Sequence, residues 1–240
     1  MSSSGGSVPL KQRAAERALD FVQSGMIVGL GHGSTAEFAV RGLAERLTNQ
    51  DIHSIRAIPC SVAVDRLARS LGIPITTLAD HPSIDVTIDG ADEVDSRMDL
   101  IKGGGGALLR EKIVAVASRR EIIVVDGSKL SQRLCTRFAL PVEVVPFAEA
   151  VETRYLESIG ATVSLRGGDQ PFHTDQGNVI LDCRFKPMED PYELGRALDA
   201  RPGIVGHGLF LGIATDLVVA DDRGAHHFAR GDDLSAVLAG

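Results

Sequence analysis

Two neighbouring runs decide the fold: DVTIDGADEVD at positions 85–95 and, after a short polar spacer, LIKGGGGALLREK at 100–112. In the first run, Val86 and Ile88 alternate with polar residues, which predicts a short strand that ends in an acidic turn. In the second run, four glycines precede a helical segment. A strand, a polar turn, a glycine loop and a helix in this order indicate an α/β protein whose turns form a ligand site.

The ionisable residues of these runs indicate proton transfer on a small, oxygen-rich anion. Asp89 and Asp92 occupy the turn, Lys102 opens the glycine loop, and Glu111 lies on the following helix. Carboxylates move protons, whereas a lysine and bare glycine N–H groups stabilise negative charge on oxygen. Each acid alone has a simpler explanation, since Asp caps turns and Glu is common on solvated helix faces. Their combination favours the site.

Three further acids follow Asp92: Glu93 and Asp95 end the first run, and Asp99 lies in the spacer. We interpret Asp95 and Asp99 as ordinary loop acids, and the pattern assigns no role to Glu93.

The expected helix at 107–117 carries an apolar stripe, formed by Leu109, Ile113, Val116 and Ala117. Glu111 is two residues from both Leu109 and Ile113, which places it about 200° around the helix from each. We therefore expect Glu111 to face a cleft or solvent.

Composition limits the class of protein. Apolar residues make up 44% of the 240 residues, aromatics only 4%, and Trp is absent, so we expect an aliphatic α/β core. The net charge of −7 argues against a nucleic-acid-binding surface, which needs clustered Lys and Arg. No apolar run approaches membrane-spanning length. Three cysteines without metal or redox spacing, and no signal peptide, indicate reduced thiols and a cytoplasmic protein.

A second anion site is expected nearer the N-terminus. An apolar strand at 26–30 runs into Gly31-His32-Gly33-Ser34-Thr35, and a helix follows at 36–47. Free N–H groups and the helix dipole at such a junction attract phosphate. A dinucleotide pattern is formally matched, but it also needs an acid at the end of the next strand, and that strand, at 55–58, ends in Pro-Cys-Ser. A glycine turn that merely lets helix pack on strand remains an alternative for this loop alone.

Strands and helices alternate through the first half, which predicts a doubly wound, mostly parallel, Rossmann-like sheet. Strands are expected at 26–30, 55–58, 73–78, 85–88 and 121–125, and helices at 10–22, 36–47, 61–71 and 107–117. Ligands bind at the carboxyl ends of such strands. We therefore expect four polar segments to converge on one cleft: 31–35, 60–61, 89–92 and 126–129.

The second half has a different order of elements. Its strand–helix–strand–strand–helix–strand pattern is that of a ferredoxin-like α+β unit. We expect a Rossmann-like domain at 8–132 plus 209–240, a smaller ferredoxin-like domain at 133–208, and a disordered Ser/Gly-rich tail at 1–7. An apolar segment at 217–220 is expected to return to the first sheet.

Five motifs in register resemble the type A ribose-5-phosphate isomerase family over most of the chain. They are GLGHGSTA (29–36), IDGADEVD (88–95), LIKGGGGALLREK (100–112), VDGSK (125–129) and LPVEVVPF (140–147). The resemblance implies interconversion of ribose 5-phosphate and ribulose 5-phosphate through an enediol in the pentose phosphate pathway. It also implies no metal or organic cofactor, and a homodimer or homotetramer.

The resemblance also implies roles for individual residues. Glu111 matches the proton-transferring base, Asp89 and Asp92 match the two acids of the turn, and Lys102 matches the lysine before the glycines. Our candidate for opening the sugar ring is Asp89, with Asp92 orienting hydroxyls. The substrate-binding residues are then Gly31, His32, Gly33, Ser34, Thr35, Asp89, Gly90, Ala91, Asp92, Lys102, Gly103, Gly104, Gly105 and Lys129.

One residue departs from the family pattern. His32 stands where the family usually has Thr, which leaves the backbone N–H in place but adds a larger, titratable ring. That ring would narrow the pocket or add a contact to phosphate. Cys60 also stands where a small hydroxyl residue is common.

Two other classes of function compete with the isomerase. A sugar-phosphate sensor would keep the phosphate loop without needing Glu111, and would usually add a DNA-binding helix-turn-helix, which this sequence lacks. A sugar-phosphate deaminase or lactonase would keep a phosphate loop but not the pairing of acidic turn and Lys-Gly-Gly-Gly.

Overall fold

The largest sheet of the computed structural model has six strands in the order β13-β12-β6-β3-β1-β2. The structure describes residues 7–238. The strands are β1 (Ile27–Leu30), β2 (Arg56–Pro59), β3 (Val86–Asp89), β6 (Glu121–Asp126), β12 (Asp216–Asp221) and β13 (Gly224–Ala229). All neighbours are parallel except β13, which forms an antiparallel hairpin with β12. The predicted return of the 217–220 segment to this sheet is confirmed.

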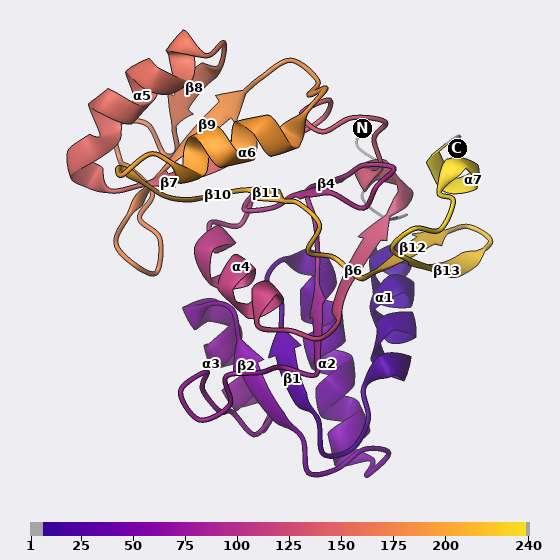
Figure 1. Ribbon diagram of the computed structural model, residues 1–240. Helices are drawn as coiled ribbons and strands as arrows, with labels where there is room; N and C mark the ends of the chain where they lie inside the picture. Colours follow the sequence, from indigo (N-terminus) through magenta and orange to yellow (C-terminus); the bar gives the residue numbers. More distant parts are fainter. Residues whose placement is uncertain (1–6, 239–240) are drawn as a thin grey trace.

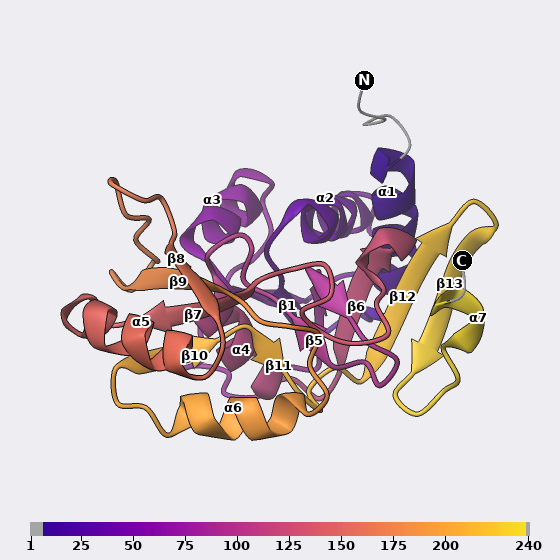
Figure 2. The ribbon, with the colours of Figure 1, turned by 90° about the horizontal axis from the view of Figure 1, so that it is seen from above.

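Helices cover both faces of the sheet (Figures 1 and 2). On one face lie α1 (Ser7–Ala18), α2 (Ser34–Thr48) and α3 (Val62–Ser70); α4 (Leu108–Val116) covers the other. The central strand β6 shows why both faces need cover: Ile122 and Val124 pack with α1 and α2, whereas Ile123 and Val125 pack on the opposite side. Each such buried side chain contributes roughly 1.5–3 kcal/mol. The predicted doubly wound α/β fold is confirmed.

The second half forms its own antiparallel sheet in the order β10-β7-β9-β8. Its elements are β7 (Leu140–Val144), α5 (Glu149–Ser158), β8 (Thr162–Leu165), β9 (Val179–Arg184), α6 (Pro191–Asp199) and β10 (Ile204–His207). The predicted βαββαβ order is confirmed, and α5 and α6 bury their apolar sides against this sheet. The division of the chain into two domains stays a prediction.

A small third sheet, which the sequence pattern does not reveal, lies between the two units. It consists of β4 (Glu93–Val94), β5 (Leu100–Ile101) and β11 (Leu209–Phe210), in the order β11-β5-β4. Strands of two residues leave no periodicity to recognise. The β4–β5 hairpin matters for the site because Asp92 directly precedes it and Lys102 directly follows it.

Two predicted elements need correction. The strand expected at 73–78 is wrong: the segment makes only a single bridge, Ala57 to Ile75, because Pro74 has no N–H to continue a ladder. The helix expected at 10–22 ends earlier, at Ala18, and a 3₁₀ turn (η1, Leu19–Phe21) follows. The predicted tail, 1–7, lies outside the described residues except for Ser7, at which α1 begins.

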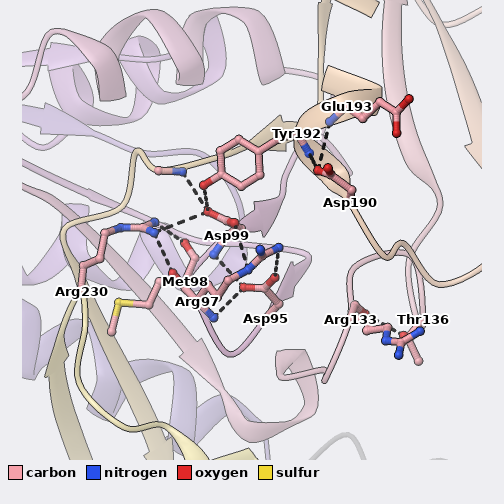
Figure 3. Close-up of polar contacts among 11 residues, drawn as sticks. Asp95, Arg97, Met98, Asp99, Arg133, Thr136, Asp190, Tyr192, Glu193 and Arg230 are labelled. Carbon is pink, nitrogen blue, oxygen red and sulfur yellow. Dashed lines mark hydrogen bonds and ion pairs between the residues drawn. The ribbon is translucent and has the colours of Figure 1, made fainter. Parts of the chain in front are cut away.

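Asp95 and Asp99 lie in a loop and do not line the pocket, as interpreted from the sequence, but they are not ordinary surface acids. Both are buried in the turn of the β4–β5 hairpin (Figure 3). Asp99 accepts hydrogen bonds from Gly212 N at 2.9 Å and from the Tyr192 hydroxyl at 3.2 Å, and it lies 3.5 Å from Arg230. Burial raises the pKa of Asp95. The partners come from distant parts of the chain, so local sequence gives no sign of them.

Candidate active site

A pocket opens where the carboxyl ends of β1, β3 and β6 meet the glycine loop after β5. Three of the four polar segments expected to converge reach it. Cys60 is buried beside it and Ser61 contacts it only through His32. Its lining residues are Lys11, His32, Gly33, Ser34, Thr35, Gly90, Ala91, Asp92, Lys102, Gly103, Gly104, Gly105, Glu111 and Lys129.

Lys102 is the centre of the site. Its side chain is only 2% exposed, and its ammonium lies 3.0 Å from Asp89 and 2.9 Å from Glu111. It also donates a hydrogen bond to the Gly90 carbonyl. Although burial lowers the pKa of Lys102, Asp89 and Glu111 outweigh that effect and raise it. Lys102 is therefore a fixed positive charge between two carboxylates.

Glu111 faces inward, and the helix stripe expected opposite to it is wrong. The buried side of α4 consists of Leu108, Glu111, Val114 and Ala115, whereas Ile113 and Val116 are exposed. Residues 108, 111 and 115 recur at helical spacing, so Glu111 belongs to the buried face. Burial raises the pKa of Glu111, although Lys102 opposes the rise. A buried carboxyl group whose pKa is raised is suited to accept and return a proton.

Asp89 lies behind Lys102 and does not line the pocket. It is 1% exposed, and its Oδ1 accepts hydrogen bonds from His32 N at 3.0 Å and Gly90 N at 2.7 Å. Gly31 is needed here, since a Cβ at this position would lie 2.3 Å from the Asp89 carboxyl group. The Gly31 N–H donates to Ile88 O, so Gly31 also stays outside the pocket wall.

The loop before α2 has the geometry of an anion site. Gly33 is the N-cap residue of α2, has φ +106° and offers no side chain to cap the helix. The first N–H groups of α2 are therefore left for a ligand at the positive end of the helix dipole. Lys11, which the sequence analysis missed, donates from Nζ to Ser34 Oγ at 2.9 Å. A lysine on α1, more than 20 residues from the loop, carries no local signal of this role.

The opposite wall is formed by Asp92, the glycine loop and Lys129. Asp92 Oδ2 accepts a hydrogen bond from Gly104 N at 2.7 Å. Lys129 ends the short 3₁₀ turn η2 (Gly127–Lys129), which Asp126 caps through Ser128 N at 2.9 Å. The pocket thus carries Lys11 beside Ser34, Lys129 on the opposite wall, and carboxylates around Lys102.

The ring of His32 lies between the two loops. Its Nδ1 is 3.0 Å from Ser61 Oγ, and Ser61 in turn caps α3 by accepting from Val64 N at 3.1 Å. A Cβ on Gly105 would lie 2.4 Å from the His32 ring, so the ring stands directly against the glycine loop. His32 therefore narrows this part of the pocket.

Neither a metal cluster nor a membrane helix is found in the part of the chain that the structure describes. Within residues 7–238, no three His, Cys, Asp or Glu side chains are grouped so that they could hold a metal ion. No helix there is both long and apolar enough to cross a bilayer.

Comparison with known proteins agrees with this geometry. The family described as "Ribose 5-phosphate isomerase A (phosphoriboisomerase A)" matches residues 56–224. Ribose-5-phosphate isomerase A of Chloroflexus aurantiacus is 55% identical over 224 residues, which cover 92% of this chain and 94% of the relative. That of Gloeobacter violaceus is 52% identical over 217 residues, 90% of this chain and 94% of the relative.

Solved structures give the same result. A D-ribose-5-phosphate isomerase in complex with phospho-erythronic acid superposes with a TM-score of 0.91 at 36% identity, covering 94% of this chain and 100% of that one. Ribose 5-phosphate isomerase from Plasmodium falciparum superposes with a TM-score of 0.90, also at 36% identity and with the same coverage. All of these relatives are ribose-5-phosphate isomerases, which favours the isomerase over the sensor, deaminase and lactonase alternatives. The chain belongs to the ribose 5-phosphate isomerase A family.

Proposed function

We propose that this protein interconverts D-ribose 5-phosphate and D-ribulose 5-phosphate, with Glu111 as the base that moves the proton between C2 and C1. The observation that carries the proposal is the buried group in which Lys102 Nζ lies 2.9 Å from Glu111 and 3.0 Å from Asp89 at the wall of the pocket. The reaction belongs to the non-oxidative branch of the pentose phosphate pathway.

The phosphate binds at the start of α2. The free N–H groups of Ser34 and Thr35 and the helix dipole attract it, and Lys11 adds a positive charge beside Ser34. Lys129 reaches the same pocket from the end of β6. Anchoring one end of a flexible open-chain sugar holds its reacting carbons in register with the base.

Proton transfer follows at the other end of the pocket. The Glu111 carboxylate takes the proton from C2 of the open-chain aldose, and the C2 electrons form a double bond to C1 while the C1 oxygen becomes negative. A proton then passes from the C2 hydroxyl to the negative C1 oxygen, and Glu111 returns its own proton to C1 as the C2 oxygen becomes the ketone. Help of this kind is worth about 10²–10⁴-fold in rate. Lys102 and the glycine-loop N–H groups stabilise the oxygen charge.

The two acids of the turn act differently because only one lines the pocket. Asp92 contacts the sugar hydroxyls directly. Asp89 is buried against Lys102 and does not reach the sugar itself. Any help that it gives to ring opening therefore acts through the position and charge of the Lys102 ammonium. A comparison of D89N with D92N separates the two: D92N weakens binding of sugar phosphates, whereas D89N lowers kcat.

The protein also forms a homodimer or homotetramer under this proposal. Phe147, the middle residue of the 3₁₀ turn η3 (Pro146–Ala148), is 99% exposed on the single chain, and Val151 nearby is 60% exposed. Exposed apolar side chains that lie together are typical of subunit contacts. Sedimentation equilibrium of the wild type and of F147E tests this, since a monomeric wild type contradicts it.

The decisive experiment is NMR of ribose 5-phosphate in D₂O with the wild type, E111Q and E45Q. Glu45 is an exposed glutamate on α2 and controls for the substitution itself. The wild type and E45Q should form ribulose 5-phosphate and bring solvent deuterium to C1, and E111Q should do neither. Product formed equally fast by E111Q rules out Glu111 as the base. A wild type that leaves the sugar unchanged overturns the proposed reaction.

A further inference from the structure

The glycine loop depends on a side chain of the other unit for its conformation. Gly103 O accepts a hydrogen bond from Gly106 N at 3.0 Å, which makes Gly103–Gly106 a β-turn with Gly104 and Gly105 at its centre. The peptide between the two central residues of a β-turn can face either way, and glycines allow both orientations at little cost. The four glycines alone therefore do not fix where the central N–H groups point.

Arg166 supplies the missing restraint. It follows β8, and its Nη1 donates to Gly103 O at 2.8 Å and to Gly104 O at 3.3 Å. The rest of its guanidinium is held by Asp182 of β9, with Nε 2.9 Å from Oδ2 and Nη2 paired with Oδ1. Its side chain is 17% exposed. The guanidinium fork is thus anchored on one side and bonded to the turn on the other.

The direction of the carbonyls determines the direction of the N–H groups. All described peptide bonds are trans, and in a trans peptide unit the C=O and N–H point in opposite directions. Because Arg166 holds Gly103 O and Gly104 O, the N–H groups of Gly104 and Gly105 point away from it. The Gly104 N–H meets Asp92 Oδ2 at 2.7 Å at the pocket. The Gly105 N–H finds no protein acceptor among residues 7–238.

We propose that Arg166 is a positioning residue that aims the Gly105 N–H group at the substrate oxygen on which negative charge develops and the Gly104 N–H group at Asp92, the acid that lines the pocket. The proposal rests on the proposed function, since it assigns the glycine loop to the enediolate. Arg166 does not line the pocket, so under this proposal it acts without touching the substrate. Through Arg166, the unit that contains β8 and β9 would contribute to catalysis at a pocket formed by the six-stranded sheet.

The test compares R166M, R166K and the control R201M. Arg201 lies in the same unit and is likewise held by a carboxylate, with Nε 2.9 Å from Glu152 Oε2, but it contacts no glycine-loop atom. For each variant we would measure kcat, KM, the melting temperature, and the affinities for phospho-erythronic acid and for inorganic phosphate by calorimetry. Phospho-erythronic acid has a carboxylate at one end and a phosphate at the other, whereas inorganic phosphate probes the α2 end alone.

We expect R166M to lower kcat about 10- to 100-fold, somewhat less than removal of an oxyanion-hole donor. It should weaken the affinity for phospho-erythronic acid about 10-fold or more. The affinity for inorganic phosphate should stay within about twofold of the wild type, since only the carboxylate end of phospho-erythronic acid meets the loop. R166K keeps the charge but lacks the fork, so it should recover only part of kcat. R201M should keep both kcat and phospho-erythronic acid affinity.

Two results would overturn the role of Arg166: unchanged kcat and phospho-erythronic acid affinity in folded R166M, or an equal loss of affinity for both ligands. If R166M fails to fold, R166K decides on the same readouts, and full activity in R166K excludes the positioning role. Failure of the proposed function looks different. In that case the wild type does not isomerise ribose 5-phosphate, while the effect of R166M on phospho-erythronic acid binding still reports on the turn.

Discussion

At the scale of single residues, the environment of Glu111 places opposite demands on its charge. Burial disfavours the carboxylate, whereas the Lys102 ammonium 2.9 Å away favours it. The net effect raises the pKa of Glu111 above its ordinary value of 4.5. A carboxyl group in this state gives up a captured proton less readily than an exposed glutamate, but it binds the proton of a weak carbon acid better.

The raised pKa of Glu111 predicts the acid side of the pH profile. The base must be ionised to act, so kcat/KM should rise with pH and reach half of its maximum above pH 4.5, the ordinary pKa of glutamate. Steady-state kinetics from acid to mildly alkaline pH measure this. E111D should keep the rising limb at a lower rate, whereas E111Q should lose activity at every pH. A limb centred at or below the ordinary value contradicts the assignment.

His32 predicts a change in substrate range. Its ring fills the space against Gly105, so H32T should open room there. We expect kcat/KM for a six-carbon aldose phosphate to rise severalfold relative to ribose 5-phosphate, because differential contacts of this size are worth about 1–3 kcal/mol. Kinetics with both sugars measure the ratio. S61A is the control, because it removes the 3.0 Å contact to Nδ1 and keeps the ring in the pocket. An unchanged ratio in H32T shows that the ring plays no part in specificity.

Site residues that lie within local motifs can be predicted from the sequence, whereas residues that reach the site from distant parts of the chain cannot. Lys102 and Glu111 were predictable because a strand, a glycine loop and a helix place them within one short segment. Lys11 and Arg166 were not, because each reaches its loop from another element of the fold. Gly31 was also singled out, and the structure adds that it permits the close approach of Asp89; its part in binding the anion stays a prediction.

At the scale of elements, α4 shows why periodicity alone can select the wrong face. The helix is apolar at Leu108, Leu109, Ile113, Val114 and Val116, which leaves more than one candidate stripe. The sheet and the β4–β5 hairpin decide between them, and they take Leu108 and Glu111 inward. The ion pair with Lys102 makes the burial of Glu111 tolerable, and that partner lies outside the helix.

The β4–β5 hairpin predicts a local effect of Arg230. Its guanidinium donates to the carbonyls of Arg97 and Met98, both at 2.7 Å, and thereby holds the turn at the end of the hairpin opposite Asp92 and Lys102 (Figure 3). R230M should leave those carbonyls without their donor and lower the free energy of unfolding by about 1–3 kcal/mol. Hydrogen exchange should speed up in the hairpin, including the Asp92 N–H that donates to Ile101 O.

A nearby arginine provides the control for R230M. Arg133 is 57% exposed and makes a 3.4 Å contact with Glu189, which is itself 87% exposed, so R133M should change neither stability nor exchange. Chemical denaturation and exchange measured by mass spectrometry on both variants separate the cases. Faster exchange spread evenly over R230M, rather than concentrated at residues 92–102, would contradict the prediction that Arg230 stabilises this hairpin locally.

At the scale of the whole molecule, the sequence predicts each sheet better than their association. The existence of both sheets, though not the order of their strands, follows from the alternation of elements and from the change of pattern after β6. The small sheet that joins them does not, since β11 contributes only Leu209 and Phe210 to β5. Its place is fixed by buried contacts: the Phe210 ring lies 5.5 Å from Lys102 Nζ and 5.1 Å from Lys112 Nζ. A contact of this kind depends on residues about 100 positions apart, and no local pattern encodes it.

The junction of the units predicts how stability depends on pH. His207, at the end of β10, is 4% exposed; its Nε2 lies 3.1 Å from Asp199, and its Nδ1 faces two donors, Leu209 N at 3.3 Å and Lys112 Nζ at 3.4 Å. A proton on Nδ1 would face these two donors and would have no acceptor there. Burial and then Lys112 lower the pKa of His207 from 6.5 to about 4. The unfolded chain therefore binds more protons between these values, so folding loses stability as pH falls from 6.5 toward 4.

Replacement of His207 isolates this contribution. H207Q keeps a donor for Asp199 but cannot gain charge, so its deficit in unfolding free energy relative to the wild type should shrink by roughly 2–3 kcal/mol as pH falls through that window. Urea unfolding at several pH values measures the difference, and the many carboxylates that also titrate cancel in the subtraction. H53Q, which alters an exposed histidine, should keep a constant offset from the wild type. A constant offset for H207Q as well would mean that His207 accepts its second proton in the folded protein, and that the donors around Nδ1 move aside when the units loosen.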